Sequence, residues 1–338
     1  MNRPQGGADT RRSAPREYAG RGLGSNQGGL HSVHVRAAQS MTLNRGHVYR
    51  DRVLPEHAGM RMLDYHVEHF RHSDATAWRA VIESGAVRVN GRVASADERV
   101  RGGDELEYHR GPWDEPEAPR EFRVVLEDEH VLVVEKPAGL QVLPAGGFSE
   151  QTLLRIVQAS AIERATAAPV HRLGRGTSGL ILFGKTELAR AELARQFRAC
   201  EPRKTYFALV RGAELPVSCI ARTPIGKLRH GPLVIHAASA EGKPSVTRIR
   251  VLRRRPECSL VAAQPITGRP DQIRIHLAAC GAPIVGDPLF GPGGAPISDA
   301  VPGAGGYFLH AAGLAFAHPA GGAQVKLRSR PDWWAELA

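Results

Sequence analysis

The stretch "PVHRLGRGTSGLILFGKT", residues 169–186, decides how the rest of the chain is interpreted. Its first half is a glycine-containing turn that carries His171 and Arg172, and its second half is an apolar run typical of a buried strand. The turn contains no Asp, Glu or Cys. If it is a catalytic loop, its reactive group must come from another part of the chain.

Length and charge narrow the class of protein. A chain of 338 residues with 42% apolar residues can fold into two or three domains with a sizeable core. Its formal net charge is +11, which makes a polyanion the first partner to consider, because arginine-rich surfaces bind phosphate backbones. Basic composition alone is weak support for this, since some genomes simply favour arginine.

Cysteine spacing and hydropathy exclude several other classes. The four cysteines stand far apart with no CxxC or Cys/His ligand spacing, so we expect neither a metal site nor a disulfide framework. A reducing, cytoplasmic location fits this pattern. We find no apolar run long enough for a membrane span and no signal peptide.

Residues 1–55 are poor in large apolar side chains and rich in Gly, Arg, Ser and Gln. Such a segment buries too little surface to offset chain entropy, so we interpret it as a flexible basic arm. An irrelevant or misassigned start of the reading frame explains the composition equally well.

Residues 61–109 have the pattern of a compact module. Apolar residues at helical spacing near residue 62 are followed by a second helix in "ATAWRAVIESG", which Gly85 ends. "AVRVNGRVAS" then predicts a hairpin at Asn90-Gly91, and "GGDELEYH" predicts a further turn and strand.

This module resembles the S4 RNA-binding domain in its "GAVRVNG" run and in Val100, Gly103 and Asp104. The resemblance makes four arginines candidate phosphate contacts, although for each one a solvated surface charge is the simpler interpretation. They are Arg79, Arg88, Arg92 and Arg101.

Residues 110–121 are rich in Pro and acidic residues and are interpreted as a linker. Residues 122–330 then alternate many short strand-like runs with a few helices. This pattern predicts an α+β fold whose second domain has a mainly antiparallel sheet.

Five motifs in the second domain occur in one order. Together they closely resemble the catalytic domain of the RluA-type family of RNA pseudouridine synthases, over roughly residues 61–328 when the S4-like module is included. The motifs are "EKPAGLQVLP" (135–144), the opening stretch (169–186), "RKTYFALVRG" (203–212), "QPITGRPDQIRIHLAACGAPIVGDPLFG" (264–291) and "LHAAGLAFAHP" (309–319).

The resemblance implies that a uridine in structured ribosomal or transfer RNA is converted into pseudouridine. The N-glycosidic bond breaks, the base turns in the pocket, and the base is rejoined through carbon. The family needs no metal or cofactor, and we expect a monomer. The base must leave its stack for the enzyme to reach it.

Each motif residue takes a role from this resemblance. Arg172 would hold the flipped nucleotide, for which a planar guanidinium is suited, unless it merely pairs with a carboxylate. Tyr206 would pack on the uracil ring and take part in proton removal. Arg274 would pair with the catalytic carboxylate, and the turn at Thr267-Gly268 would present Arg269 to RNA. His171 is expected to be a hydrogen-bonded packing residue.

The sequence departs from the family at Gly174, where the family has its catalytic Asp. A second departure places Asp271 three residues before Arg274. If this segment is extended, the two side chains point to opposite faces; if it turns, they can converge. Asp271 is therefore a speculative substitute carboxylate, against the simpler interpretation of a turn or surface acid.

Two functions remain open. The chain can be a synthase whose carboxylate comes from elsewhere, which the presence of Arg172, Tyr206 and Arg274 favours. It can instead be a catalytically inactive RNA-binding protein on the same fold, because loss of a nucleophile can leave ligand binding intact.

Overall fold

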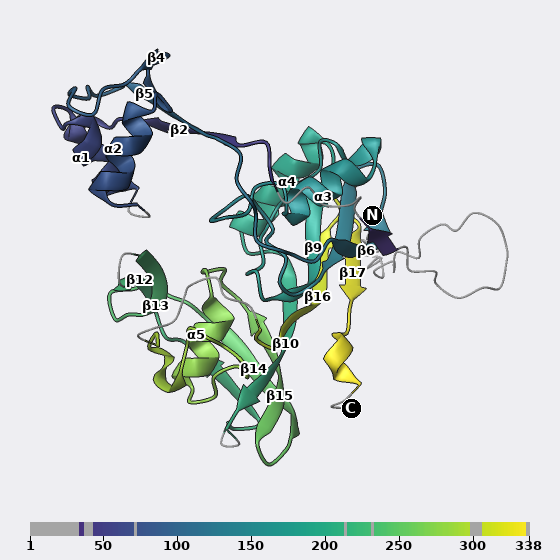
Figure 1. Ribbon diagram of the computed structural model, residues 1–338. Coiled ribbons are helices and arrows are strands. Elements are labelled where there is room, and N and C mark those ends of the chain that lie inside the picture. Colours follow the sequence, from purple (N-terminus) through teal and green to yellow (C-terminus); the bar gives the residue numbers. More distant parts are fainter. Residues whose placement is uncertain are drawn as a thin grey trace, which may run out of the picture.

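The computed structural model describes residues 34–36, 43–70, 73–212, 215–230, 233–297 and 306–335. These residues form a small domain, drawn in purple and blue, and a larger domain built on one long sheet (Figure 1). The predicted α+β class is confirmed, with a small module followed by a mainly antiparallel sheet domain. Of the helices in these segments, none is long and apolar enough to cross a membrane.

The small domain packs two helices against a sheet of order β2-β5-β3-β4. The predicted turns are confirmed: Gly85 ends a helix with φ 80°, and Asn90 and Gly91 both have positive φ in the hairpin. Met62 and Trp78 are buried in its core. The elements are β2 (His47–Arg52), η1 (Pro55–His57), α1 (Met62–His69), α2 (Ala75–Glu83), β3 (Val87–Val89), β4 (Arg92–Val93) and β5 (Glu105–Arg110).

The boundary expected for the N-terminal arm, residue 55, is too late. Strand β2 belongs to the small domain, because it pairs along its whole length with β5. Upstream, β1 (His34–Arg36) pairs with the first strand of the large sheet. The rest of the expected flexible arm, residues 1–33 and 37–42, lies outside the described residues.

The larger domain has an eleven-stranded sheet of order β1-β6-β7-β9-β16-β10-β15-β14-β11, with β8 and β17 pairing beside β9 and β16. Among the described strand pairs of this sheet, only β9 and β16 run parallel. The strands are β6 (Glu121–Glu127), β7 (Val131–Lys136), β8 (Ala168–Pro169), β9 (Ser178–Gly184), β10 (Arg203–Arg211), β11 (Ser218–Ala221), β14 (Thr247–Arg254), β15 (Cys258–Pro265), β16 (Leu309–Ala317) and β17 (Gln324–Arg328).

Helices cover this sheet in two halves. Along β9, Ile181 and Phe183 belong to the core cluster that contains the buried residues of α3, whereas Leu180 and Leu182 belong to the cluster that contains Leu193 of α4. This alternation places α3 and α4 on opposite faces. The remaining elements are α3 (Leu153–Ser160), η2 (Ile162–Arg164), α4 (Glu187–Arg198), β12 (Ile225–His230), β13 (Leu233–Ala238), α5 (Gln272–Ala279), η3 (Pro292–Gly294) and η4 (Asp332–Trp334).

The second half of the sheet is covered by α5, which packs Ile273 and Leu277 with Ala208 of β10. The β9–β16 contact is therefore a seam between two half-domains, each with its own core. The opening turn, residues 170–177, lies directly before β9 at this seam, and Tyr206 of β10 packs against both cores.

The predicted linker is anchored to the large domain. Glu115 is buried, and its carboxylate accepts hydrogen bonds from the Asn44 amide at 2.8 Å and from the backbone N–H groups of Glu150 and Gln151. Burial raises the pKa of Glu115, but these hydrogen bonds together lower it by more. The net pKa therefore lies below its usual value. An ionised carboxylate therefore holds the connection in place.

Candidate active site at the seam of the large domain

The glycine-containing turn is held by a buried lysine. Lys136 Nζ donates hydrogen bonds to the carbonyl oxygens of Pro137, Leu140 and Arg175, at 2.7, 2.8 and 3.1 Å. Burial, with the nearby charge of Arg175, lowers the pKa of Lys136 to about 7. The turn closes on itself through a 3.0 Å hydrogen bond from the Thr177 N–H to the Gly174 carbonyl. These bonds fix the backbone on which Arg172 and Gly174 stand.

Gly174 is exposed, but the space beside its Cα is taken. A Cβ atom at this position would lie 2.7 Å from the Tyr307 hydroxyl and 3.5 Å from Thr177 Oγ1. The Tyr307 hydroxyl is itself 3.1 Å from Thr177 Oγ1. Tyr307 was missed by the sequence reasoning, because it follows a run of glycines outside the five motifs.

Arg274 is the centre of the buried polar contacts. Its Nε and Nη2 each lie 2.8 Å from a carboxylate oxygen of Asp287, and both side chains are buried. Its guanidinium also lies 5.0 Å from the ring centroid of Phe290 and 4.4 Å from that of Tyr307. Burial lowers the pKa of Arg274, but Asp287 and Asp271 raise it more, so the group stays charged.

Asp271 and Arg274 converge. Arg274 Nη1 lies 2.7 Å from Asp271 Oδ1, and the Asp271 side chain remains 33% exposed. The sequence left open whether this segment is extended or turns, and the structure shows that it turns. Asp271 has φ 52° and immediately precedes α5. The structure therefore provides one carboxylate that is both paired with Arg274 and open to solvent.

Arg172 and Arg269 lie on two different loops. Arg172 is exposed and forms no ion pair with any of the described residues, which argues against a purely structural pairing. Arg269 is half-buried, and its Nε has no hydrogen-bond partner among the described atoms. Its backbone N–H donates to Gln272 Oε1, which also accepts from Thr267. Both guanidinium groups retain capacity for a ligand.

Tyr206 lies at the seam, opposite Ala311 of β16 and Ala263 of β15. It packs against the core cluster that contains Tyr307 and against the cluster that contains Leu173. Burial raises the pKa of Tyr206 to about 12, so the phenol carries its proton at neutral pH. It can therefore pack against a base and donate a hydrogen bond, but it is a poor proton acceptor without help.

His171 is confirmed as a packing residue. Its ring stacks on Phe197, with centroids 4.7 Å apart, and its Nε2 accepts a 3.0 Å hydrogen bond from the Leu182 N–H. Burial lowers the pKa of His171 to about 3, so the ring is neutral. A neutral ring whose Nε2 accepts this hydrogen bond carries its one proton on Nδ1 and is not in the acidic imidazolium form, which fits packing better than acid–base chemistry.

The four candidate arginines of the small domain fall into two pairs. Arg79 lies 3.6 Å from Glu83, and Arg92 forms an ion pair with Glu98. Arg88 and Arg101 are exposed and form no ion pair with the residues that the structure describes. The second pair is therefore the better placed to meet phosphates.

The arrangement joins a loop guanidinium, a paired carboxylate and an aromatic ring at one seam. Gly174 contacts Tyr307, Tyr307 stacks on Arg274, and Arg274 binds Asp271. Within the described segments, no group of three His, Cys, Asp or Glu side chains is placed to hold a metal ion. These residues can together position a nucleobase and present a carboxylate to it.

The chain is similar to known proteins in sequence and fold. Residues 130–279 match the family model for RNA pseudouridylate synthase. The chain is 42% identical over 260 residues to "Uncharacterized RNA pseudouridine synthase slr1592" of Synechocystis, covering 76% of this chain and 89% of that protein. It is 34% identical over 273 residues to "Ribosomal large subunit pseudouridine synthase D" of Neisseria meningitidis, covering 77% and 72%. A solved structure, "Human RNA Pseudouridylate Synthase Domain Containing 1", shares the fold, with a TM-score of 0.53, 24% identity and coverage of 66% of this chain and 89% of that one.

Proposed function

The chain belongs to the RNA pseudouridine synthase family, and on that premise we propose that it converts uridine into pseudouridine in structured RNA, with Asp271 as the working carboxylate. In the balanced reaction the N1–C1′ bond of the nucleotide breaks, a C5–C1′ bond forms, the proton on C5 is lost to water, and N1 takes up a proton, so the product is an isomer of the substrate. Large-subunit ribosomal RNA is the first substrate to test, because one curated relative is named for it. Transfer RNA is the second.

The contact between Asp271 and Arg274 carries this proposal. The family resemblance calls for a carboxylate paired with the arginine at position 274, and Gly174 cannot supply it. Asp271 does, at 2.7 Å, and it is still one-third exposed. Arg274 is anchored from the other side by the buried Asp287, so it is held rigidly toward Asp271. A charge-paired, partly exposed carboxylate at a seam is suited to attack or to stabilise a developing positive charge.

The other site residues have separate tasks. The free guanidinium of Arg172 is suited to stack on the space that the flipped base leaves, or to hold its phosphate. Tyr206, which keeps its proton, packs on the uracil ring and is available as a donor. Arg269 offers an N–H group without a partner among the described atoms to the RNA backbone. The small domain, through Arg88 and Arg101, adds phosphate contacts outside the pocket.

Tritium release tests the proposal. Ribosomal RNA transcribed with 5-tritiated uridine loses its label when C5 becomes bonded to C1′. We expect release with the wild-type chain and none with Asp271→Asn, which keeps the shape but loses the charge. RNA affinity, measured by filter binding, should be the same for both. Glu163→Gln, an exposed acid on η2, is the control that should release tritium normally.

One observation favours the alternative of an inactive RNA-binding protein. The Tyr307 hydroxyl lies 2.7 Å from the point where the family's Asp side chain would begin, which is too close for an ordinary contact. If the wild-type chain binds ribosomal and transfer RNA tightly yet releases no tritium from either, the enzyme proposal fails and the alternative stands. Full release by Asp271→Asn would instead reject Asp271 as the carboxylate while leaving the reaction in place.

A further inference from the structure

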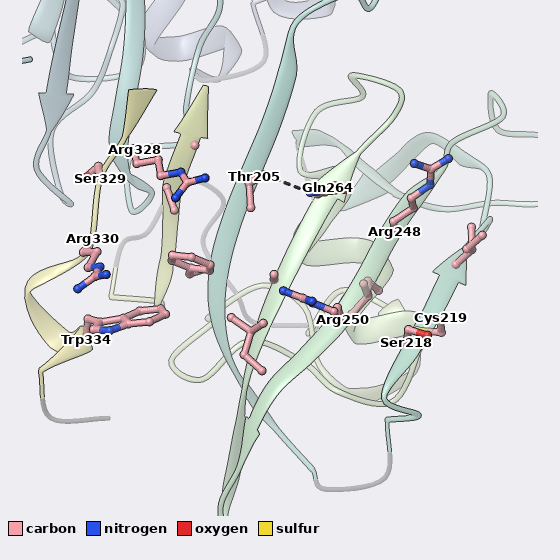
Figure 2. Close-up of a pocket in the computed structure, with 17 residues that line it drawn as sticks. Thr205, Ser218, Cys219, Arg248, Arg250, Gln264, Arg328, Ser329, Arg330 and Trp334 are labelled. Carbon is pink, nitrogen blue, oxygen red and sulfur yellow. Dashed lines mark hydrogen bonds between the residues drawn. The ribbon is translucent and has the colours of Figure 1, made fainter. Parts of the chain in front are cut away.

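The second half of the sheet has a concave face away from the candidate active site. A groove of about 1050 Å³ is lined by strands β10, β11, β14, β15 and β16, by the end of β17, and by the segment that follows it (Figure 2). This volume lies at the upper end of the range for small-molecule pockets. The groove is open, so it suits a length of chain better than a single small ligand.

Alternation along the strands separates this groove from the site at the seam. Thr205 and Phe207 of β10 line the groove, whereas Tyr206 between them packs into the cores on the other face. On β15, Gln264 lines the groove while Ala263 packs with residues of α5. A ligand in the groove would therefore lie across the sheet from Asp271 and Arg274.

The groove is positively charged. Figure 2 shows Arg248 and Arg250 on β14 at one side and Arg328 and Arg330 from the C-terminal segment at the other. All four are exposed, and none forms an ion pair with a carboxylate of the described residues. No Asp or Glu lines the groove; Asp332 follows Arg330 in sequence but is not part of the lining. Four guanidinium groups with no counter-charge in the groove favour an anionic occupant.

Aromatic rings lie beside these charges. The rings of Phe207 and Trp334 are 4.6 Å apart at a 41° tilt, and both residues are half-buried. The Arg330 guanidinium lies 5.9 Å from the Trp334 ring centroid. Thr205 and Gln264, joined by a 3.4 Å hydrogen bond, add polar groups to the floor. Guanidinium groups for phosphates and rings for bases are the combination that binds single-stranded nucleic acid.

We propose that this groove binds a single-stranded segment of RNA, as a contact remote from the candidate active site. An acidic peptide would satisfy the arginines but would leave the aromatic pair without a planar partner, so RNA fits both features. This inference rests on the proposed function in one respect only, the choice of RNA as the polyanion that binds the groove. Its binding requires no turnover.

Salt-dependent binding tests the groove. The probe is a fluorescent twelve-nucleotide oligouridylate, with a blunt RNA duplex of equal length as comparison. Each single-strand phosphate contact contributes about 0.7 to the slope of log affinity against log salt. Arg248→Gln/Arg250→Gln in the full chain should therefore lower the slope for the oligouridylate by about 1.4, with a smaller effect on the duplex.

The control removes the same charge elsewhere. Arg155→Gln/Arg198→Gln changes two exposed arginines on α3 and α4, and its slope should match the wild type. An unchanged slope in the groove variant, or an equal loss in the control, overturns the proposal. The Asp271→Asn variant should keep the full slope, so failure of the proposed reaction and failure of the groove are distinguishable.

Crosslinking locates the contact without any substitution in the protein. An oligouridylate containing 5-iodouridine, irradiated with the wild-type chain, should attach to the peptide that contains Trp334. Labelling confined to the residues around Gly174, or to the small domain, would reject the groove as an RNA-binding surface. A groove variant that loses a protein partner but binds RNA normally would also overturn the proposal.

Discussion

The hydroxyl of Tyr307 stands 2.7 Å from the point where a side chain on Gly174 would begin. Tyr307 cannot easily withdraw, because it is buried, its ring lies against Arg274 and its hydroxyl contacts Thr177. Glycine at 174 and tyrosine at 307 are thus sterically matched. At position 174, where the family motif has Asp, the Tyr307 hydroxyl leaves no free space for a side chain.

Gly174→Asp alone should therefore destabilise the chain, by about 1–3 kcal/mol, through overpacking against Tyr307. Tyr307→Phe removes the obstructing oxygen at a cost of about 1 kcal/mol for the lost hydrogen bond. In the double variant we expect the two costs to be less than additive, measured by urea unfolding. Strict additivity would show that the two side chains do not compete for this space.

Arg172→Ala should reduce tritium release at least tenfold while leaving the free energy of unfolding within about 0.5 kcal/mol of the wild type, as for ordinary surface substitutions. The reason is that Arg172 is exposed and forms no ion pair with the described residues. Arg198→Ala, on α4, is the matched control and should alter neither quantity. A large loss of stability in Arg172→Ala would assign that arginine a structural role instead.

Asp287→Asn should be much more destabilising than Asp271→Asn, although both remove a carboxylate from Arg274. The pair between Arg274 and Asp287 is buried on both sides, and breaking such a pair costs about 3–5 kcal/mol. Asp271 is one-third exposed, so its loss should cost less than about 1 kcal/mol. Thermal unfolding of the two variants checks the order, and equal losses would contradict it.

The pH dependence of stability should contain a contribution from His310. This buried ring lies 2.8 Å from the Ser178 and Ser329 hydroxyls and 3.9 Å from Glu135. Burial, with the charge of Arg123, lowers the pKa of His310 to about 4. Between pH 4 and pH 6.5 the unfolded chain then binds more protons, so stability falls as the pH is lowered, by up to about 1.4 kcal/mol per pH unit.

Replacing His310 by Gln should remove this contribution, up to about 1.4 kcal/mol per pH unit, from the slope of the free energy of unfolding against pH between pH 4 and pH 6.5. Denaturant unfolding at half-unit pH intervals supplies the comparison. Parallel curves for the wild type and the variant would mean that His310 does not take up a proton on unfolding in this range.

Local chemistry made part of the structure predictable from sequence. Asn90-Gly91 specified its hairpin because both residues adopt positive φ at low cost. Strand β2 could not be placed, because its partner β5 lies more than fifty residues downstream and its own sequence, "HVYRDR", is polar. The sequence showed no sign of this pairing.

The site divides in the same way. Arg172, Tyr206 and Arg274 could be named from their motifs, whereas the direction of Asp271 depended on a single left-handed residue before α5. Tyr307 was invisible because its role comes from contacts with Gly174, Thr177 and Arg274, which are distant in sequence. The groove was invisible because its arginines face one side only after strands β14, β15, β10, β16 and β17 are aligned.

The pairing of β1 with β6 has a consequence for how the two domains move. Strand β1 lies in the large sheet, the small domain follows it in sequence, and the chain is again in the large sheet from Glu121, so the small domain is an insertion with two connections. These connections are clasped together where Leu43 bridges Asp114 and Asn44 binds Glu115. A domain held by two adjacent connections has fewer orientations open to it than a domain held by a single linker. RNA held by the small domain would thus meet the seam from a restricted set of directions.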